Sequence, residues 1–569
     1  MKNQEVADIF KRVVKVLELK GANPFRIRAY EKAAQNIENL TEDIEIVCKE
    51  GELTSIPGIG EDLANKIKEI LNTGTLKQYE ELRKDIPDGL FKLLEIPGLG
   101  PKTVKTIYEK LKIDSLEKLE EAARKGRLRV LEGIRAKTEE NILRGIALLK
   151  EGKERKPLYV ALAVAKGFIE ELKKMKEIEK IEVAGSLRRK KDTVKDIDIL
   201  VTSPAPSKVM GKFVHLETVK EVLAKGETKS SVISKEYSMQ VDLRVVTKES
   251  FGSALMYFTG SKQFNIKFRQ LAIKNNYKIN EYGVFRQNKK VAGESEEEIF
   301  SLMKMQYIPP ELREDKGEVE LSLKNSLPKL VERNDIKGDF HIHSKYSDGS
   351  STIEEIAEKA KELGYAYVGV CDHSQSLKVA HGVSIKDIFK KIEEVRKVSK
   401  KKGITVLCGA EVDIDSEGRL DYPDSVLKEL DIVIIAIHTG FKQSKEQITR
   451  RIVRASQNKY VHIIAHPTGR LWGVRDSYEV DWEEIFKVAK DYRVSLEINC
   501  YPQRLDLDDT HCMKAKRKGI KLALGTDAHL LDQMLNIDLG VSVARRGWLE
   551  SADLLNCMDK EELFKWLRK

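Results

Sequence analysis

The spacing of apolar residues divides the chain into a helical first part and two later parts in which strands alternate with helices. Up to about residue 150, apolar positions recur with the 3.6-residue period of amphipathic helices, and short Gly-containing breaks separate them. From about residue 157, β-rich segments such as KIEVAGSLRR, DIDILVT and MQVDLRVVT appear. A polar segment with prolines, near 308–337, precedes a second strand–helix series. Since 569 residues are too many for one core, we expect several domains.

The strands of the C-terminal series are nearly continuous in apolar residues, which predicts a parallel sheet buried on both faces. We expect seven strands, and most of them end in His, Asp or Glu. Of the ten histidines, only His215 precedes residue 341. Because the carboxyl ends of barrel strands meet on one face, the pattern predicts a barrel with a site there. The candidate ligands at the strand ends are His341, His343, His373, Glu411, His438, His466, Asp527 and His529.

The first of these strands begins the motif GDFHIHSKYSDG at 338–349. His341 and His343 are two positions apart, so a strand turns both imidazoles to one face. Taken alone, His-x-His is more often a pair of structural histidines than a metal site. The recurrence of ligand-type residues at the other strand ends favours the metal site.

Three aspartates mark the middle of the chain. Asp196 and Asp198 alternate on one strand, and Asp242 lies on a strand that can pair beside it. Three carboxylates on adjacent strands repel one another unless divalent cations lie between them, as in two-metal phosphoryl transfer. The Gly-Ser-x-Arg-Arg run at 185–189 precedes them and argues against three unrelated surface aspartates.

A sequence element repeats in the helical part. SIPGIGEDLANKIKEIL at 55–71 is echoed by EIPGLGPKTVKTIYEKL at 95–111 and more loosely by VLEGIRAKTEENILRGI at 130–146. In the first two copies, glycines before a helix let backbone N–H groups face a phosphate oxygen, which resembles the helix-hairpin-helix motif. Arg135 stands where the third copy has lost its second glycine. The predicted DNA-backbone contacts are Gly58, Gly60, Gly98 and Gly100.

Composition narrows the class of protein. The chain has 101 Lys and Arg against 91 Asp and Glu, a mild excess that tolerates a polyanion without requiring one. Its six cysteines form no Cys-x-x-Cys pair, so the sequence suggests neither a disulfide framework nor a cysteine zinc site. Charges interrupt every apolar run, which predicts no membrane span and a cytoplasmic protein.

The Gly-Ser-x-Arg-Arg run, the three aspartates and YFTGSKQFNIKFRQLA at 257–272 resemble the family X DNA polymerases typified by polymerase beta. The resemblance implies that the aspartates bind Mg²⁺ or Mn²⁺. It also implies nucleotide contacts: Ser186 and Arg189 to the triphosphate, Tyr257 and Phe258 beside the sugar, and Asn265 to the base, with Gly185 and Gly260 shaping the site. Arg269 would contact the template strand. For any one of these residues, a core aromatic or a solvated charge is the alternative.

The resemblance extends to the N-terminal part, where NPFRIRAYEKAAQNI and the first hairpin are similar to the family's small DNA-binding domain. In some members a lysine of this hairpin forms a Schiff base with a 5′-deoxyribose phosphate. Lys66 falls at the matching position. Asp62 stands where a basic residue is found in the polymerase beta type, so a solvated helix lysine is the alternative reading of Lys66.

The C-terminal motifs resemble the PHP domain, a distorted seven-stranded barrel that carries three metal ions. The resemblance implies that Glu411 bridges two ions, one shared with His341, His343 and Asp527 and the other with His438 and His466. Asp348, His373 and His529 would hold the third. Mixed imidazole and carboxylate ligands suit Mn²⁺ or Zn²⁺, and such a cluster serves phosphoester hydrolysis. Arg470 either steadies a phosphate or is a rim charge.

Together these parts resemble the prokaryotic family X DNA polymerases with a C-terminal PHP domain. The expected domains are helical at 1–80 and 81–150, a nucleotidyltransferase palm at 151–245, a thumb at 246–315, a linker at 316–337 and the PHP barrel at 338–569. The expected protein is a monomer that binds gapped or primer-template DNA and dNTPs, fills short gaps in base excision repair and has a 3′-5′ exonuclease. AP-endonuclease and 3′-phosphatase activities stay open for the barrel. The alternatives are a small-molecule phosphatase of the histidinol phosphate type and a non-enzymatic DNA-end scaffold.

Overall fold

The structure is a computed structural model that describes residues 2–38, 40, 43–94, 96, 99–131, 134–135, 138–140, 142–143, 145–146 and 155–568. The chain divides into two compact units. The first unit comprises Met1–Arg155, Val164–Val183 and Lys195–Lys304, and the second comprises Lys156–Ala163, Ala184–Val194 and Met305–Lys569.

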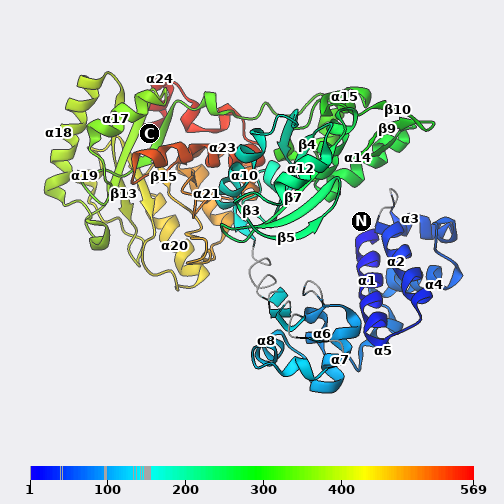
Figure 1. Ribbon diagram of the computed structural model, residues 1–569. Coiled ribbons are helices and arrows are strands. Elements are labelled where there is room, and N and C mark those ends of the chain that lie inside the picture. The colour runs from blue at the N-terminus through cyan, green and yellow to red at the C-terminus, as the bar shows by residue number, and fades with distance from the viewer. Residues whose placement is uncertain are drawn as a thin grey trace. The chain divides into compact units, whose positions relative to one another are not determined.

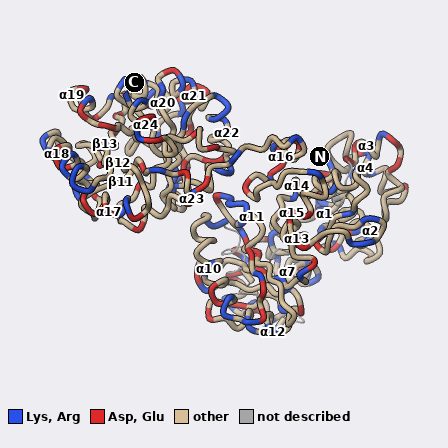
Figure 2. Tube along the Cα trace, turned by 90° about the horizontal axis from the view of Figure 1, so that it is seen from above, with Lys and Arg blue, Asp and Glu red and all other residues tan. Residues whose placement is uncertain are grey.

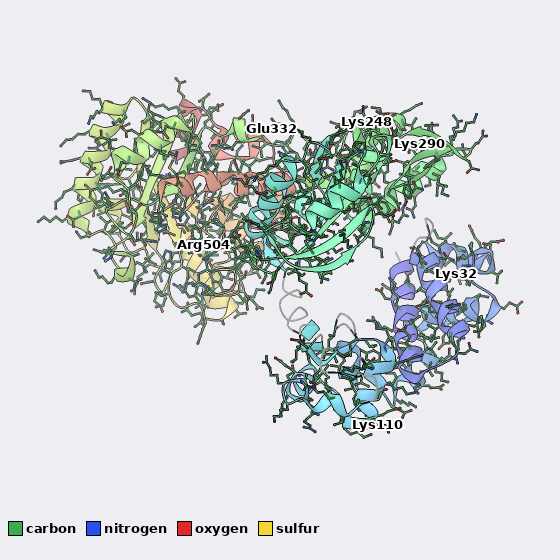
Figure 3. All side chains as sticks on the ribbon, viewed as in Figure 1. Lys32, Lys110, Lys248, Lys290, Glu332 and Arg504 are labelled. Carbon is green, nitrogen blue, oxygen red and sulfur yellow. The ribbon has the colours of Figure 1, made fainter. Side chains whose placement is uncertain are left out.

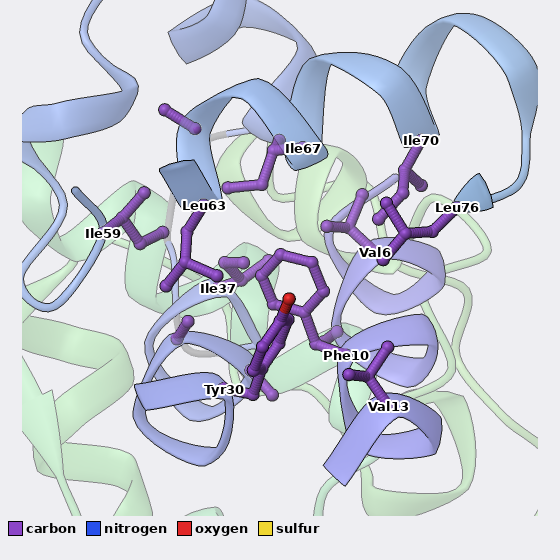
Figure 4. Close-up of a cluster of buried hydrophobic side chains, with 14 of the residues drawn as sticks. Val6, Phe10, Val13, Tyr30, Ile37, Ile59, Leu63, Ile67, Ile70 and Leu76 are labelled. Carbon is purple, nitrogen blue, oxygen red and sulfur yellow. The ribbon is translucent and has the colours of Figure 1, made fainter. Parts of the chain in front are cut away.

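The N-terminal part of the first unit is helical, as the 3.6-residue period predicts. Its helices are α1 (Lys2–Lys20), α2 (Pro24–Glu38), α3 (Ile44–Lys49), α4 (Glu61–Thr73), α5 (Lys77–Arg83), α6 (Asp88–Leu93), α7 (Pro101–Leu111) and α8 (Leu116–Arg124). The apolar faces of the first helices enclose a core in which Phe10 and Tyr30 pack edge to face, with ring centroids 5.3 Å apart (Figure 4). Leu63 and Ile67 of α4 are buried in the same core, which fixes the helix that follows the first hairpin.

A five-stranded mixed sheet follows, with strand order β2-β4-β7-β6-β5. Its strands are β2 (Lys180–Val183), β4 (Asp196–Thr202), β5 (Val219–Lys225), β6 (Lys229–Ser234) and β7 (Gln240–Val246). The central pair β4 and β7 is parallel, and the other neighbours are antiparallel. Helices α10 (Leu158–Lys173) and α12 (Pro206–Phe213) accompany the sheet. The aspartates therefore lie on the two central strands.

After the sheet come α13 (Phe251–Thr259) and α14 (Lys262–Lys274), and then a three-stranded antiparallel sheet and α15 (Glu296–Leu302). The small sheet consists of β8 (Lys278–Asn280), β9 (Gly283–Arg286) and β10 (Lys289–Ala292). Ser261 caps α14 by accepting a hydrogen bond from the backbone N–H of Phe264, which ends the turn between the two helices.

The second unit, in which Figure 1 marks the C-terminus, contains a seven-stranded parallel sheet. The strands lie in sequence order. The strands are β11 (Gly338–Ile342), β12 (Tyr367–His373), β13 (Thr405–Asp413), β14 (Ile432–Ala436), β15 (Ile463–Ile464), β16 (Ser495–Asn499) and β17 (Leu522–Gly525). A parallel bridge between Ile342 and Ala528 joins the first strand to the segment after the last. The sheet thus closes into a barrel, and the prediction of seven parallel strands is confirmed.

Helices alternate with these strands along the chain, each burying an apolar stripe. They are α17 (Ile353–Glu362), α18 (Ile385–Lys402), α19 (Asp424–Leu427), α20 (Lys445–Ser456), α21 (Trp482–Asp491), α22 (Asp509–Arg517), α23 (Ile537–Arg546) and α24 (Lys560–Leu567). Figure 2 shows basic and acidic residues interleaved along α17 and α18. Side chains cap several of them, as Thr352 and Glu355 do for α17 in a capping box.

The segment predicted as a linker, 316–337, is folded. It contains α16 (Glu318–Leu323) and the 3-10 helix η5 (Arg333–Asp335), and a further 3-10 helix, η4 (Pro310–Leu312), precedes it. Some of its polar residues are buried. Glu318 is fully buried, and its carboxylate is satisfied there by hydrogen bonds from the backbone N–H groups of Asp315 and Lys316. This segment packs within the second unit.

Candidate active sites

The central sheet brings the three predicted aspartates together. Asp198 on β4 is directly opposite Asp242 on β7, and Asp196 lies two residues earlier on the same face as Asp198. Burial, followed by the charges of Asp196 and Asp242, raises the pKa of Asp198 to about 6. Lys229 places its Nζ 3.3 Å from an oxygen of Asp242 and compensates part of this charge. Such an arrangement is suited to divalent cations, which would relieve the repulsion.

Helices α13 and α14 hold the residues expected near the nucleotide. The guanidinium carbon of Arg244 lies over the Phe258 ring, 4.1 Å from the ring centroid. Tyr257 packs edge to face against Phe258, with ring centroids 5.1 Å apart. Asn265 donates from Nδ2 to the Tyr257 carbonyl at 2.7 Å, and Arg269 Nε donates to the Asn265 carbonyl at 3.3 Å. Gly260 ends α13 at a φ of +65°, which favours glycine. These side chains form one connected set.

Gly185 and Ser186 begin the short helix α11 (Gly185–Arg188). Gly185 has a φ of +62°, a conformation that glycine adopts without strain. Arg189 follows the helix, and its Nε lies 3.0 Å from an oxygen of Glu314. These residues belong to the second unit, whereas the three aspartates belong to the first.

All nine candidate ligands of the barrel lie at or just beyond the carboxyl ends of its strands. Within the described residues, three groups of donor atoms are close enough to hold a cation each. The groups are His343, Asp348, His373 and His529; His341, His343 and Asp527; and His373, Glu411 and His438. The first group adds His343 to the expected Asp348, His373 and His529, and the second contains the expected His341, His343 and Asp527 without Glu411. The third joins Glu411 to His438 but includes His373 in place of His466.

Glu411 is the centre of this cluster. Its Oε1 lies 2.8 Å from Nε2 of His466 and 3.3 Å from Nε2 of His438, while its Oε2 lies 3.5 Å from Nε2 of His341. Glu411 is 1% exposed. Despite burial, which acts in the opposite direction, the nearby histidines hold the pKa of Glu411 well below its ordinary value. The Glu411 carboxylate is therefore ionised, and its two oxygens face different imidazoles.

Two further carboxylates, which the sequence analysis does not predict, orient ligands by binding the imidazole nitrogen that faces away from the cluster. Glu497 on β16 accepts a hydrogen bond from Nδ1 of His341 at 2.7 Å, and Asp413 on β13 accepts one from Nδ1 of His438 at 3.0 Å. Each bond turns Nε2 of its histidine toward the cluster. The signal in the sequence is an acidic residue inside an otherwise apolar strand, as in VSLEIN.

The donor set fits metal ions. Nδ1 of His343, Nδ1 of His466 and Oε2 of Glu411 are buried and have no hydrogen-bond partner among the described residues. An unpaired buried polar atom is costly, and cations held by the groups that contain His343 and Glu411 would satisfy Nδ1 of His343 and Oε2 of Glu411. Imidazole and carboxylate donors together suit Mn²⁺ or Zn²⁺ better than Mg²⁺ alone.

A cleft of about 420 Å³ opens beside the cluster. Besides ligands, its lining includes Phe441, Tyr501 and two arginines, Arg475 and Arg504. Arg504, labelled in Figure 3, has its Nε 3.4 Å from Asp527. Arg470, which the sequence offered for a phosphate, instead donates to the backbone carbonyls of Arg504 and Leu505. The arginines that can meet a phosphate in the cleft are therefore Arg475 and Arg504.

Comparison with known proteins identifies the parts of the chain. Family models match as a helix-hairpin-helix domain at residues 1–76, a SAM-like helix-hairpin-helix tandem at 91–147, a nucleotidyltransferase domain at 165–271, a DNA polymerase beta thumb at 254–314 and a PHP domain at 339–500. The chain is 38% identical over 576 residues to the DNA polymerase/3′-5′ exonuclease PolX of Bacillus subtilis, and the match covers 100% of both chains. The chain belongs to the prokaryotic family X DNA polymerases with a C-terminal PHP domain.

The PHP part also has relatives of its own. A protein named probable phosphatase from Thermoanaerobacter sp. is 31% identical over 233 residues, which are 38% of this chain and 89% of that protein. Another, from Caldanaerobacter subterraneus, is 32% identical over 207 residues, 34% of this chain and 76% of that protein. The expected fold, with helix-hairpin-helix regions, a nucleotidyltransferase palm with thumb and a PHP barrel, is thus confirmed.

The helix-hairpin-helix regions of this polymerase are described in part. Gly58 has a φ of +81°, and Gly60 and Gly100 are the N-caps of α4 and α7. In the described part of the chain, no side chain caps either helix at these positions, so N–H groups in the first turn of α4 and, after Pro101, which has none, in the first turn of α7 are available to a phosphate. Gly98 lies outside the described residues, whereas Arg135 of the third copy lies within them.

Lys66 lies on α4 with its Nζ paired to Asp62 and 5.4 Å from the centroid of the Tyr30 ring. Burial lowers the pKa of Lys66, but hydrogen bonds with Asp62 and Tyr30 outweigh it and raise the pKa above the ordinary value. A nucleophilic amine must be neutral, so the pairing with Asp62 opposes Schiff-base chemistry.

In the described residues, no helix is long and apolar enough to cross a membrane.

Proposed function

We propose that this polymerase fills short gaps in DNA during base excision repair in the cytoplasm and trims 3′ ends in the 3′-5′ direction at its PHP barrel. The observation that supports it most is the coexistence of a cluster of three aspartates and a cluster of His, Asp and Glu side chains in a chain that matches its PolX relative over its whole length. Asp198 faces Asp242 in register at one centre, and nine ligand-type residues converge at the other.

At the polymerase centre, Asp196, Asp198 and Asp242 would hold Mg²⁺ or Mn²⁺. Such ions activate the attacking hydroxyl and neutralise the phosphates. Ser186 and Arg189 bind the triphosphate, and Gly185 and Gly260 shape the backbone around it. Tyr257 and Phe258 contact the sugar, Asn265 the base and Arg269 the template strand. Arg244, which packs against Phe258, keeps the aromatic pair in place.

At the barrel, the nine ligands would hold three Mn²⁺ or Zn²⁺ ions, which supply Lewis acidity for phosphodiester hydrolysis. Glu497 and Asp413 orient His341 and His438. Arg475 and Arg504 line the cleft and bind the phosphates on either side of the scissile bond. Phe441, against which Arg475 stacks at 3.6 Å, forms an apolar wall for the terminal nucleoside.

DNA is the proposed macromolecular substrate, and dNTPs are the small-molecule substrates of a monomeric enzyme. The proposed contacts to phosphates of gapped or primer-template DNA are Gly58, Gly60, Gly98 and Gly100, together with backbone N–H groups in the first turns of α4 and α7. Such contacts make binding depend on salt but not on sequence. AP-endonuclease and 3′-phosphatase activities use the same phosphoester chemistry and are open alternatives at the barrel.

A small-molecule phosphatase is the second candidate, because the PHP region matches proteins named probable phosphatases. The intact polymerase centre disfavours it. A phosphatase would have no use for Asp198, whose buried carboxylate is costly unless a cation is bound there.

The test uses a labelled primer on a one-nucleotide-gapped duplex with Mn²⁺, with and without dNTPs. Wild type is expected to extend the primer with dNTPs and to shorten it without them. Asp242→Ala is expected to lose extension only, and His341→Ala to lose shortening only. Loss of both activities in Asp242→Ala would reject two independent centres, and shortening that persists in His341→Ala would place the nuclease outside the barrel. Hydrolysis of a small phosphate ester without either DNA activity would favour the phosphatase.

A further inference from the structure

Loop 184–194, which carries the two residues proposed to bind the triphosphate, packs with the PHP barrel in the second unit. At its C-terminal end, β3 (Thr193–Val194) pairs with β1 (Lys156–Pro157) of the same unit. The backbone N–H of Leu158 donates to the carbonyl of Asp192 at 2.9 Å. Residues 156–158 of the second unit therefore fix the C-terminal end of this loop.

One barrel arginine makes the main connection. Arg546, the last residue of α23, donates from Nη1 to the backbone carbonyl of Arg189 at 2.8 Å and to Oε1 of Glu314 at 3.2 Å. Its Nη2 pairs with Asp509 at the start of α22. Arg546 is 3% exposed. A planar guanidinium can serve all three acceptors at once, which an ammonium cannot.

The same glutamate fixes the side chain of Arg189. Nε of Arg189 lies 3.0 Å from Oε1 of Glu314, the oxygen that Arg546 also contacts. Burial raises the pKa of Glu314, but the charges of Arg189, Arg546 and Lys191 outweigh it and lower the pKa below its ordinary value. Glu314 therefore stays ionised and holds the Arg189 guanidinium in one orientation.

A second barrel arginine holds the far end of the loop. Nη1 of Arg470 lies 3.4 Å from Oδ2 of Asp192, while its Nε donates to the carbonyl of Arg504 at 2.8 Å. Its guanidinium also packs on Trp472, 4.8 Å from the ring centroid. Loop 184–194 is thus attached to the barrel both at Arg189 and at Asp192.

We propose that Arg546 of the PHP barrel is a positioning residue for nucleotide binding by the polymerase, acting through Arg189 and Glu314. The proposal rests on the assignment of Arg189 to the triphosphate. A guanidinium that must meet a phosphate needs its backbone and side chain fixed to within a fraction of an ångström. Arg546 fixes both, the backbone directly and the side chain through Glu314. The barrel then contributes to synthesis without contacting the nucleotide.

The experiment compares full-length wild type with Arg546→Ala, Arg546→Lys and Arg545→Ala in single-nucleotide extension and in 3′ digestion without dNTPs. Arg545 is the matched control: it precedes Arg546 on α23 and contacts Glu311 and the carbonyl of Val331. Arg546→Ala is expected to raise KM for the dNTP about tenfold, as loss of a charged hydrogen bond does, with kcat and digestion nearly unchanged. Arg546→Lys keeps the charge beside Asp509 and is expected to show a smaller rise. Arg545→Ala is expected to leave KM unchanged.

Two results would overturn the proposal. An unchanged KM for the dNTP in folded Arg546→Lys and Arg546→Ala would show that the barrel does not position Arg189. A parallel fall of kcat, digestion and melting temperature in Arg546→Ala, with wild-type values in Arg546→Lys, would show a merely structural role. If wild type extends no primer at all, or if Arg189→Ala leaves KM for the dNTP unchanged, the proposed function fails instead.

Discussion

Oε1 of Glu497 lies 2.7 Å from Nδ1 of His341, and both side chains are almost completely buried inside the barrel. The imidazole donates this hydrogen bond, so the nitrogen left for a cation is Nε2, which faces Glu411 and Asp527. The carboxylate also accepts a hydrogen bond at Oε2 from the backbone N–H of His466. One buried glutamate therefore orients a ligand on β11 and the segment that carries a ligand after β15.

We predict that Glu497→Gln lowers exonuclease activity and Mn²⁺ affinity 10- to 100-fold, on the order found for residues behind metal ligands. The amide can donate to the imidazole and stabilise the wrong tautomer. Isothermal titration with Mn²⁺ measures the affinity, and gapped-primer extension is expected to stay at the wild-type rate. Asp431→Asn is the control, since Asp431 is a barrel carboxylate that accepts from the N–H of Cys408 away from the ligands. Equal Mn²⁺ affinity in Glu497→Gln and wild type would contradict the role of Glu497.

The metal-free polymerase centre is predicted to lose stability as the pH rises. Burial and two neighbouring carboxylates raise the pKa of Asp198 from 3.8 to about 6. Its contribution is therefore fully present below pH 3.8 and is lost as the pH rises through about 6, at a cost of about 3 kcal/mol. In EDTA, Asp198→Asn is expected to melt above wild type at pH 8 and to lose this advantage by pH 4.

Differential scanning calorimetry at both pH values tests this expectation. Asp85→Asn, which changes a side chain that is 84% exposed, is the control and is expected to change little. Replacing EDTA with Mn²⁺ is expected to abolish the difference, because Mn²⁺ binds the polymerase centre of wild type more tightly than that of Asp198→Asn, while its binding at the barrel stabilises both proteins equally. A melting temperature of Asp198→Asn below that of wild type at pH 8 in EDTA would contradict the prediction.

Most of the ligand set could be predicted from the sequence. The carboxyl ends of parallel strands meet on one face of the barrel, so His, Asp and Glu residues that end apolar runs are predicted to lie close together there. Glu497 could not be found in this way, because it lies in the middle of β16, where the side-chain direction depends on the tilt of the barrel. Asp413 ends β13 two residues after Glu411, and a strand end alone does not show that its carboxylate binds His438 rather than a cation. The position of Arg470 shortly after His466 suggests either a phosphate contact or a rim charge, yet its guanidinium donates to the carbonyls of Arg504 and Leu505. The polar segment 316–337 reads as a linker, since single-residue polarity cannot show that Glu318 satisfies its carboxylate with backbone N–H groups.

For Lys66, we predict that Asp62→Asn increases lyase activity. Asp62 raises the pKa of the Lys66 ammonium, so removing its charge leaves more neutral amine to attack a 5′-deoxyribose phosphate and also removes a repulsion from the phosphate. Borohydride trapping on incised abasic DNA measures the Schiff base. Lys66→Ala is expected to trap nothing, and Glu69→Gln, on the same helix, is expected to match wild type. Trapping that persists in Lys66→Ala would assign the amine elsewhere.

A fully buried ion pair beneath the barrel site gives the last prediction. Lys391 of α18 places its Nζ 2.6 Å from Oδ2 of Asp372 and donates to the carbonyls of Val370 and Gly409. Asp372 also accepts hydrogen bonds from Ser344 and Ser347. Lys391→Met leaves an uncompensated charge and is expected to cost about 3–5 kcal/mol of unfolding free energy.

Thermal and urea unfolding of the full chain measure this loss in the barrel transition. The neighbouring Lys390→Met is the matched control, because Lys390 is exposed and pairs with Asp387 on the surface, where such pairs contribute at most about 1 kcal/mol. Adding Asp372→Asn to Lys391→Met is expected to recover part of the loss, because the second change removes the unpaired charge while an amide oxygen still accepts from the serines. A double variant less stable than Lys391→Met would mean that the hydrogen bonds of Asp372 to Ser344 and Ser347, rather than its pairing with Lys391, hold this part of the barrel together.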